Sequence, residues 1–147
     1  MGLKIYLPVA VAVFLAATTG ADLIARTSVG GQPFAAALRE HLHWAAVQFV
    51  GTLLLLAPFI AVAFVCARTE KQARDRSVAL IFTVAMLALL YFYFQGYQAS
   101  ERAMLDKMWT AATLSIGLLP FFIGVPVVLT VMGAGALAAK LDRRVSS

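Results

Sequence analysis

Four long apolar runs separated by short polar segments dominate the chain, and they cover about residues 5–25, 45–67, 78–96 and 110–139. About 20 apolar residues in a helix cross the roughly 30 Å hydrocarbon core of a bilayer, so each run is long enough to span it. Hydrocarbon offers the backbone no hydrogen-bonding partner, and the alternation typical of barrel strands is absent, so we expect helices. The pattern predicts an all-α integral membrane protein, a four-helix transmembrane bundle forming a single domain over residues 1–147.

The fourth run is unusually long and contains two prolines. Its thirty positions, 110–139, include no Asp, Glu, Lys, Arg or His. As one helix it measures about 45 Å, which is more than an upright, straight crossing needs. Pro120 and Pro126 each lack the N–H for a helical hydrogen bond and clash with the preceding turn. We therefore expect a long, proline-kinked fourth helix that packs through its small residues, Gly117, Gly124, Gly133 and Gly135.

The distribution of Lys and Arg predicts the orientation. With four crossings, both termini share a side with the connection 68–77, and the connections 26–44 and 97–109 lie on the other side. The first side carries eight of the 12 cations, namely Lys4, Arg68, Lys71, Arg74, Arg76, Lys140, Arg143 and Arg144. The other side carries Arg26, Arg39, Arg102 and Lys107. The positive-inside rule therefore predicts cytoplasmic termini in the bacterial inner membrane, with Trp44 and Trp109 as anchors at the outer interface.

Each outer connection contains a chain break followed by helical signals. In the first, Pro33 suits the first turn of a helix. Phe34, Leu38 and Leu42 then recur every four residues, as expected of an amphipathic helix in the interface or of an extension of the second span. In the second, we expect Gly96 to end the third helix and Ser100 to cap a new one.

The first run also resembles a secretory signal peptide, because Lys4 precedes it and the small residues Thr19-Gly20-Ala21 stand near its end. The apolar pattern resumes at Leu23 and Ile24, which favours an uncleaved signal-anchor helix.

Two segments suggest that the bundle consists of two related hairpins. Residues 55–62 (LLAPFIAV) align with residues 118–125 (LLPFFIGV), and five of the eight positions match. Both segments would run from the outside to the inside, as in a duplicated two-helix unit with parallel repeats. Chance resemblance between apolar sequences is the alternative explanation.

Composition agrees with lipid as the main surroundings. Hydrophobic residues make up 62% of the chain and charged residues 13%, against about 25% charged in a typical soluble domain. The net charge of +5 comes from cations scattered between the apolar runs, so we expect the bilayer and no nucleic acid as a partner. The single cysteine, Cys66, excludes an intramolecular disulfide.

Asp22 is the only acidic residue inside an apolar run. A carboxylate at membrane depth is costly, and it is a candidate for a proton or cation relay. The competing interpretation, which we favour, is a shallow position near the outer end of the helix and a pair with Arg26 at i, i+4.

His41 and His43, beside Glu40, are weak candidates for a metal site. Residues two apart on a helix point in nearly opposite directions, so both could bind one ion only from an irregular loop. Met104 or Met108 would then be soft partners for copper. No histidine lies inside a span, which argues against haem between the helices, and we expect no cofactor.

Polar residues of the spans are candidates for contacts between helices or for a polar pocket in the outer half. The main ones are Gln48 and Gln95, with Thr and Ser hydroxyls nearby. The basic segment from Arg68 to Arg76 is expected to fix the topology, with contact to anionic lipid headgroups as a second effect.

The sequence contains no Ser-His-Asp order, phosphate-binding glycine loop or paired carboxylates. The leading hypothesis is therefore non-catalytic: a small membrane protein that packs against a membrane-protein partner or a second copy, such as an accessory subunit, assembly factor or immunity-type protein. The alternative is a small ion or solute transporter or channel that works as an oligomer, motivated by Asp22 and the interrupted fourth helix. A membrane enzyme that uses the outer histidines is a third class.

Overall fold

The computed structural model describes residues 2–145, and this part of the chain is helical with no strand. The α-helices are α1 (Leu3–Leu15), α2 (Ala21–Ile24), α3 (Phe34–Val47), α4 (Phe49–Thr69), α5 (Asp75–Leu105), α6 (Trp109–Gly117) and α7 (Val125–Val145). Three π-helical segments lie between them, η1 (Ala16–Gly20), η2 (Ala25–Val29) and η3 (Pro120–Gly124).

Four helical stretches are long and apolar enough to cross a membrane, namely Leu3–Val29, Phe49–Thr69, Asp75–Leu105 and Trp109–Asp142. The first joins α1, η1, α2 and η2 end to end. Helix α4, with 21 residues, measures about 31 Å, which matches the thickness of a bilayer's hydrocarbon core. The prediction of an all-helical chain with four long apolar helices is confirmed.

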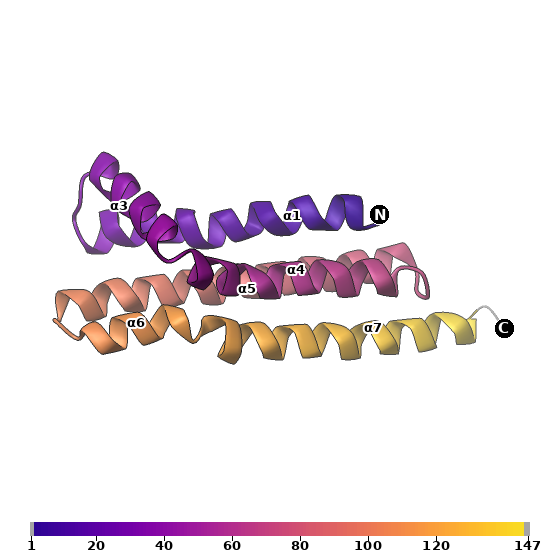
Figure 1. The fold of residues 1–147 in the computed structure, drawn as a ribbon. Coiled ribbons are helices and arrows are strands. Elements are labelled where there is room, and N and C mark those ends of the chain that lie inside the picture. The colour runs from indigo at the N-terminus through magenta and orange to yellow at the C-terminus, as the bar shows by residue number, and fades with distance from the viewer. Residues whose placement is uncertain (1, 146–147) are drawn as a thin grey trace.

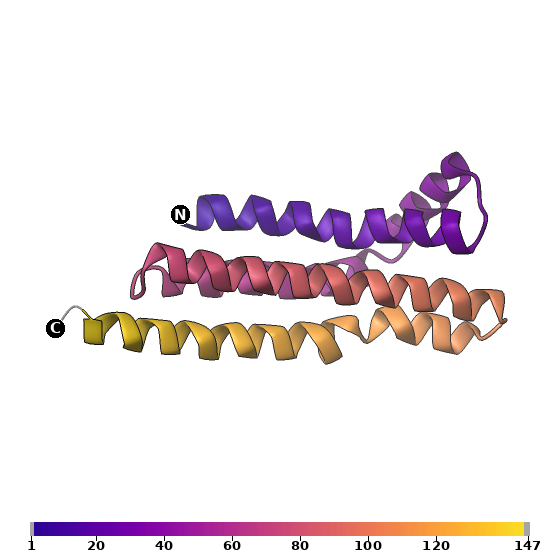
Figure 2. The same ribbon diagram turned by 180° about the vertical axis from the view of Figure 1, so that it is seen from behind.

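The long helices lie side by side, with α4 and α5 between α1 and the helices α6 and α7 (Figures 1 and 2). Helix α4 contacts α1, α5 and α7, and α5 also contacts α6 and α7. The start of α1, the connection 70–74 and the end of α7 lie at one end, called here the terminal end. The connections 30–33 and 106–108 lie at the other, called here the opposite end.

Aromatic side chains fill the centre of the helix array. Phe59 is fully buried and contacts Phe14 and Tyr93 edge to face, with ring centroids 5.5 and 5.1 Å apart. Nearer the terminal end, Tyr6 packs on Phe82 at 4.7 Å. The Tyr93 hydroxyl donates a hydrogen bond to the Leu55 carbonyl at 3.0 Å, so this polar group is satisfied within the apolar core.

The sequence predicted that the third helix ends at Gly96, and this prediction is wrong. Helix α5 continues to Leu105. Gly96 is buried, and a Cβ atom on it would lie 2.8 Å from Cδ1 of Leu119. The glycine therefore serves the close approach of the fourth span rather than a turn. Ser100 is not a helix cap either, because its hydroxyl donates to the Ala112 carbonyl at 3.0 Å and joins α5 to α6.

Helix α3 begins directly after Pro33, where the amphipathic pattern was predicted to start. It is a separate helix rather than an extension of the second span, because Gln48 adopts φ −101° and ψ 43°. Helix α4 therefore begins at Phe49 and not near residue 45, and α3 lies oblique to the long helices (Figure 1). Phe34 and Leu42 of α3 are exposed.

The fourth span is interrupted where the first of its prolines lies. Helix α6 ends at Gly117, and the π-helical segment η3 begins at Pro120. Pro126 falls in the first turn of α7, where a missing N–H costs little. Gly124 packs directly on Pro58 of α4, and a Cβ on Gly135 would lie 2.9 Å from the Thr69 hydroxyl oxygen.

Candidate functional site

A cluster of charged residues lies toward the opposite end, between the first helix, α3 and α5, and Asp22, Arg26 and Glu101 in it are buried. Asp22 and Arg26 of the first helix are each only 7% exposed. The Arg26 Nε donates to the Asp22 carboxylate at 2.9 Å, so the predicted i, i+4 pair is present. A charge-assisted hydrogen bond of this kind offsets part of the cost of removing both groups from water.

Arg26 also binds a carboxylate from another helix. Its Nη1 lies 2.9 Å from an Oε2 of Glu40 on α3. The rigid, planar guanidinium presents several donors at once, so one Arg26 holds both Asp22 and Glu40. This contact ties α3 to the first helix, although α3 itself buries only Ala37.

His41 forms the second link between α3 and the first helix. Its Nδ1 lies 2.8 Å from Oδ2 of Asp22, and its Nε2 lies 3.0 Å from the Thr19 hydroxyl. His43 is exposed and packs edge to face on Trp44, with ring centroids 6.0 Å apart. The two histidines therefore separate, as their spacing on a helix predicted.

Within the described residues, no group of three or more His, Cys, Asp or Glu side chains has an arrangement that could hold a metal ion. His41 is engaged by Asp22 and Thr19.

Glu101 is a member of the cluster that sequence reasoning missed. It is 6% exposed, and its carboxylate lies against Gly30, where an added Cβ would overlap it. Neither a hydrogen bond nor an ion pair joins Glu101 to another residue in the described range. The core face of α5 contains Leu89, Tyr93 and Tyr97, and the same spacing leads to Glu101. That signal was available, but it required the helix to continue past Gly96.

Carboxylates outnumber cations in this cluster. It contains the carboxyl groups of Asp22, Glu40 and Glu101 but only one guanidinium, that of Arg26. The cluster therefore fastens α3 to the first helix through Arg26 and His41, and His41 also holds the Thr19 hydroxyl. Its carboxyl groups can accept a proton or a small cation.

The remaining candidate residues lie outside the cluster. Gln48 and Gln95 are exposed. The buried glutamine of α5 is Gln98, which the sequence did not single out. Trp44 and Trp109 are 46% and 64% exposed. Their role as interface anchors stays a prediction.

Comparison with known proteins gives no relative. No protein-family model matches the chain, and neither a curated protein nor a solved structure does.

Replacement of Arg26 by Gln is expected to lower the free energy of unfolding by about 3–5 kcal/mol, because it leaves the buried Asp22 carboxylate without its arginine. The measurement is denaturant unfolding of the purified protein in mild detergent. The control is Arg102→Gln. Arg102 is an exposed arginine in the last turn of α5, and its replacement is expected to cost less than about 0.5 kcal/mol. Equal effects of the two variants would contradict a special role for Arg26. Should Arg26→Gln not fold, Arg26→Lys tests the guanidinium geometry instead, because it keeps the charge but loses the planar set of donors that binds Asp22 and Glu40.

His41→Ala is expected to loosen α3, whereas His43→Ala is not. The first variant removes two hydrogen bonds that hold α3, each worth about 1 kcal/mol. Tryptic cleavage after Arg39 should therefore become at least about tenfold faster, because cleavage requires local opening of the helix. Similar cleavage rates in both histidine variants would show that His41 does not hold α3.

Proposed function

We propose that the chain is a multi-pass protein of the bacterial inner membrane that acts non-catalytically by packing against another membrane protein. In this proposal the four apolar helices cross the bilayer as a bundle of two hairpins, and the fourth is bent around Pro120 and Pro126. The excess of Lys and Arg at the terminal end supports cytoplasmic termini. An accessory subunit, an assembly factor and an immunity-type protein all fit this description.

The filled interior supports contact rather than conduction. Phe14, Phe59 and Tyr93 meet at the centre of the helix array, and Leu89 is fully buried nearby. The charges of Asp22, Arg26, Glu40 and His41 are engaged with one another. The outer surface is therefore the part of the molecule left for function.

The observation that carries the proposal is the orientation of the glycines on the fourth span. Gly124 and Gly135 are buried against α4, whereas Gly117 and Gly133 are exposed, and a Cβ on either would meet nothing within 4 Å. A glycine inside a helix costs about 1 kcal/mol relative to alanine, so an outward glycine is unfavourable for the chain alone. Small residues allow another helix to approach closely in a membrane, which gives Gly133 a role.

Large apolar side chains surround Gly133 on the same face. Leu129, Met132 and Leu137 are each more than half exposed. Lipid tails cover such side chains as well as a protein does, so these residues are compatible with lipid or with a protein as neighbour. Gly133 is the residue that favours the helix of another protein. The partner helix would come from another membrane protein or from a second copy of this chain.

The second candidate function is a small ion or solute transporter working as an oligomer. The observation that favours it is the surplus of carboxylates in the buried cluster, where Glu101 has no hydrogen bond or ion pair with the described residues. Such a group inside a membrane protein is a typical site for proton or cation movement.

Gly133→Leu is expected to reduce cross-linking to the partner helix at least tenfold in native membranes, because the larger side chain prevents close approach. The matched control is Gly20→Leu on the first helix, where an added Cβ also meets nothing within 4 Å. Both variants should keep the unfolding free energy of the wild type to within about 1 kcal/mol. The measurements are cross-linking, co-purification in mild detergent and denaturant unfolding.

A wild-type protein that remains alone in cross-linking and co-purification would contradict the proposed function. If the same protein then passes cations across liposomes, and Glu101→Gln abolishes this flux, the second candidate function replaces the first.

A further inference from the structure

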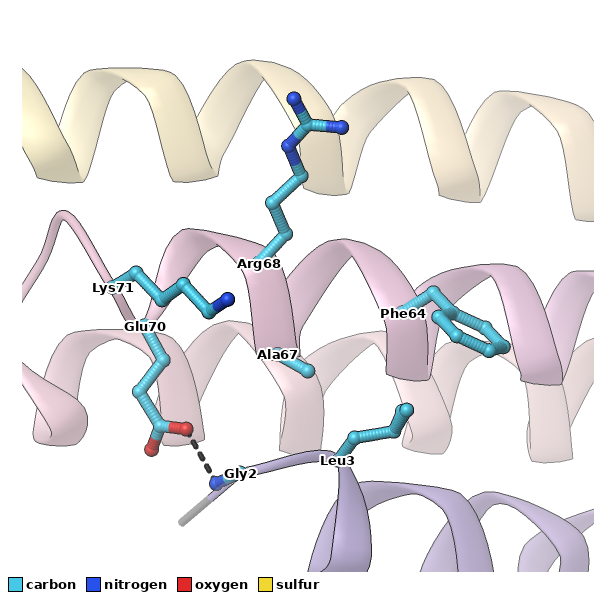
Figure 3. A pocket seen from close by; sticks show the side chains of 7 residues that line it. All are labelled: Gly2, Leu3, Phe64, Ala67, Arg68, Glu70 and Lys71. Atoms are coloured by element: carbon cyan, nitrogen blue, oxygen red, sulfur yellow. Dashed lines mark hydrogen bonds between the residues drawn. The ribbon is translucent and has the colours of Figure 1, made fainter.

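A surface hollow of about 500 Å³ lies at the terminal end, between the start of α1 and the end of α4 (Figure 3). Gly2 and Leu3 form one side of it. Phe64 and Ala67 form the facing wall on α4, with Arg68 and Lys71 one turn further along. The hollow is far from the charge cluster around Arg26, and the proposed partner contact does not use it.

The hollow has an apolar wall and a basic rim. Leu3 points toward α4, where it lies near Ala67 and Phe64 (Figure 3). Lys71 reaches back along α4 toward Ala67, whereas the side chain of Arg68, which also lines the hollow, extends away from Gly2 and Leu3 (Figure 3). A ligand that fits both parts carries a negative charge at one end and hydrocarbon at the other.

The two cations of the rim are not neutralised by the described part of the chain. Arg68 and Lys71 are exposed, and neither forms an ion pair with a described residue. Glu70, which stands between them, is held instead by the first helix. Its carboxylate accepts hydrogen bonds from the Gly2 backbone N–H and, at 3.4 Å, from the Tyr6 hydroxyl. Glu70 thus fixes α1 against α4 and leaves the charges of Lys71 and Arg68 for an anion.

The position of the hollow matches the depth of lipid phosphates. Phe64 belongs to the apolar part of α4, and the polar connection 70–74 begins one to two turns later. In the orientation proposed above, this boundary faces the cytoplasmic leaflet, whose anionic lipids attract each nearby Lys or Arg by about 1 kcal/mol.

We propose that the hollow binds one anionic phospholipid, with its phosphate against Lys71 and the upper part of an acyl chain against Leu3 and Phe64. The nearby charge of Arg68 adds to the attraction. This inference rests on the membrane orientation of the proposed function, but it does not depend on a protein partner. It assigns α1 and α4 a shared lipid site that goes beyond general attraction between basic residues and the membrane surface.

The test is native mass spectrometry of the full chain in mild detergent, titrated with phosphatidylglycerol or with phosphatidylcholine. We expect one molecule of phosphatidylglycerol to bind at least tenfold more tightly than phosphatidylcholine. The double variant Lys71→Gln/Arg68→Gln should lower the affinity for phosphatidylglycerol about twenty-fivefold, since each removed charge accounts for about fivefold. Phe64→Ser should also weaken binding, because the acyl chain loses its apolar wall.

The matched control is Arg74→Gln/Arg76→Gln, which removes two exposed charges at the same end but outside the hollow. It should change the affinity less than threefold. Equal losses in the two double variants would overturn the site in favour of diffuse attraction, as would a wild type that binds both lipids equally. Competition by millimolar inorganic phosphate would identify a free-phosphate site instead. Because no partner is present in this experiment, its failure leaves the proposed function to its own cross-linking test.

Discussion

A charge buried among apolar helices has no partner except another group of the same chain, and this constraint accounts for the arrangement toward the opposite end. Arg26 can be buried because Asp22 and Glu40 both accept its hydrogen bonds. Since Glu40 belongs to α3, satisfying Arg26 also positions a helix that buries almost nothing itself. His41 binds the same Asp22 carboxylate, so two residues of α3, Glu40 and His41, join this helix to the first one. The position of α3 thus depends on the ion pair between the Arg26 guanidinium and Glu40.

The sequence predicted what depends on local pattern and missed what depends on distant neighbours. Length and apolarity identify the four long helices because hydrocarbon permits few alternatives, and the i, i+4 spacing identifies the pair of Asp22 and Arg26. Gly96 was misread as a break, since only the packed structure reveals that Leu119 occupies the space of its missing side chain. The same error hid Glu101, which follows the core face of α5 beyond that glycine. Likewise, the contacts of Glu40 and His41 depend on how α3 folds back.

The two functional proposals come from opposite parts of the molecule and from groups that the fold itself leaves unused. Aromatic rings pack on one another at the centre, and the charged groups toward the opposite end are paired with one another, which leaves little space for a substrate. On the fourth span, Gly133 gains nothing from the chain's own packing and so favours a neighbouring helix. At the terminal end, Lys71 and Arg68 line a partly apolar hollow and form no ion pair with a described residue, which favours a charged lipid. Both proposals require that lipid surrounds the four helices.

That requirement is tested most directly by the accessibility of single cysteines in intact cells, on a Cys66→Ala background. Asp106→Cys reports on the opposite end and Gln72→Cys on the terminal end, and both positions are exposed. The account predicts that a membrane-impermeant maleimide labels Asp106→Cys in intact cells and labels Gln72→Cys only after the membrane is permeabilised. Labelling of Gln72→Cys in intact cells would contradict the orientation. Equal labelling of both positions before permeabilisation would contradict the four crossings themselves.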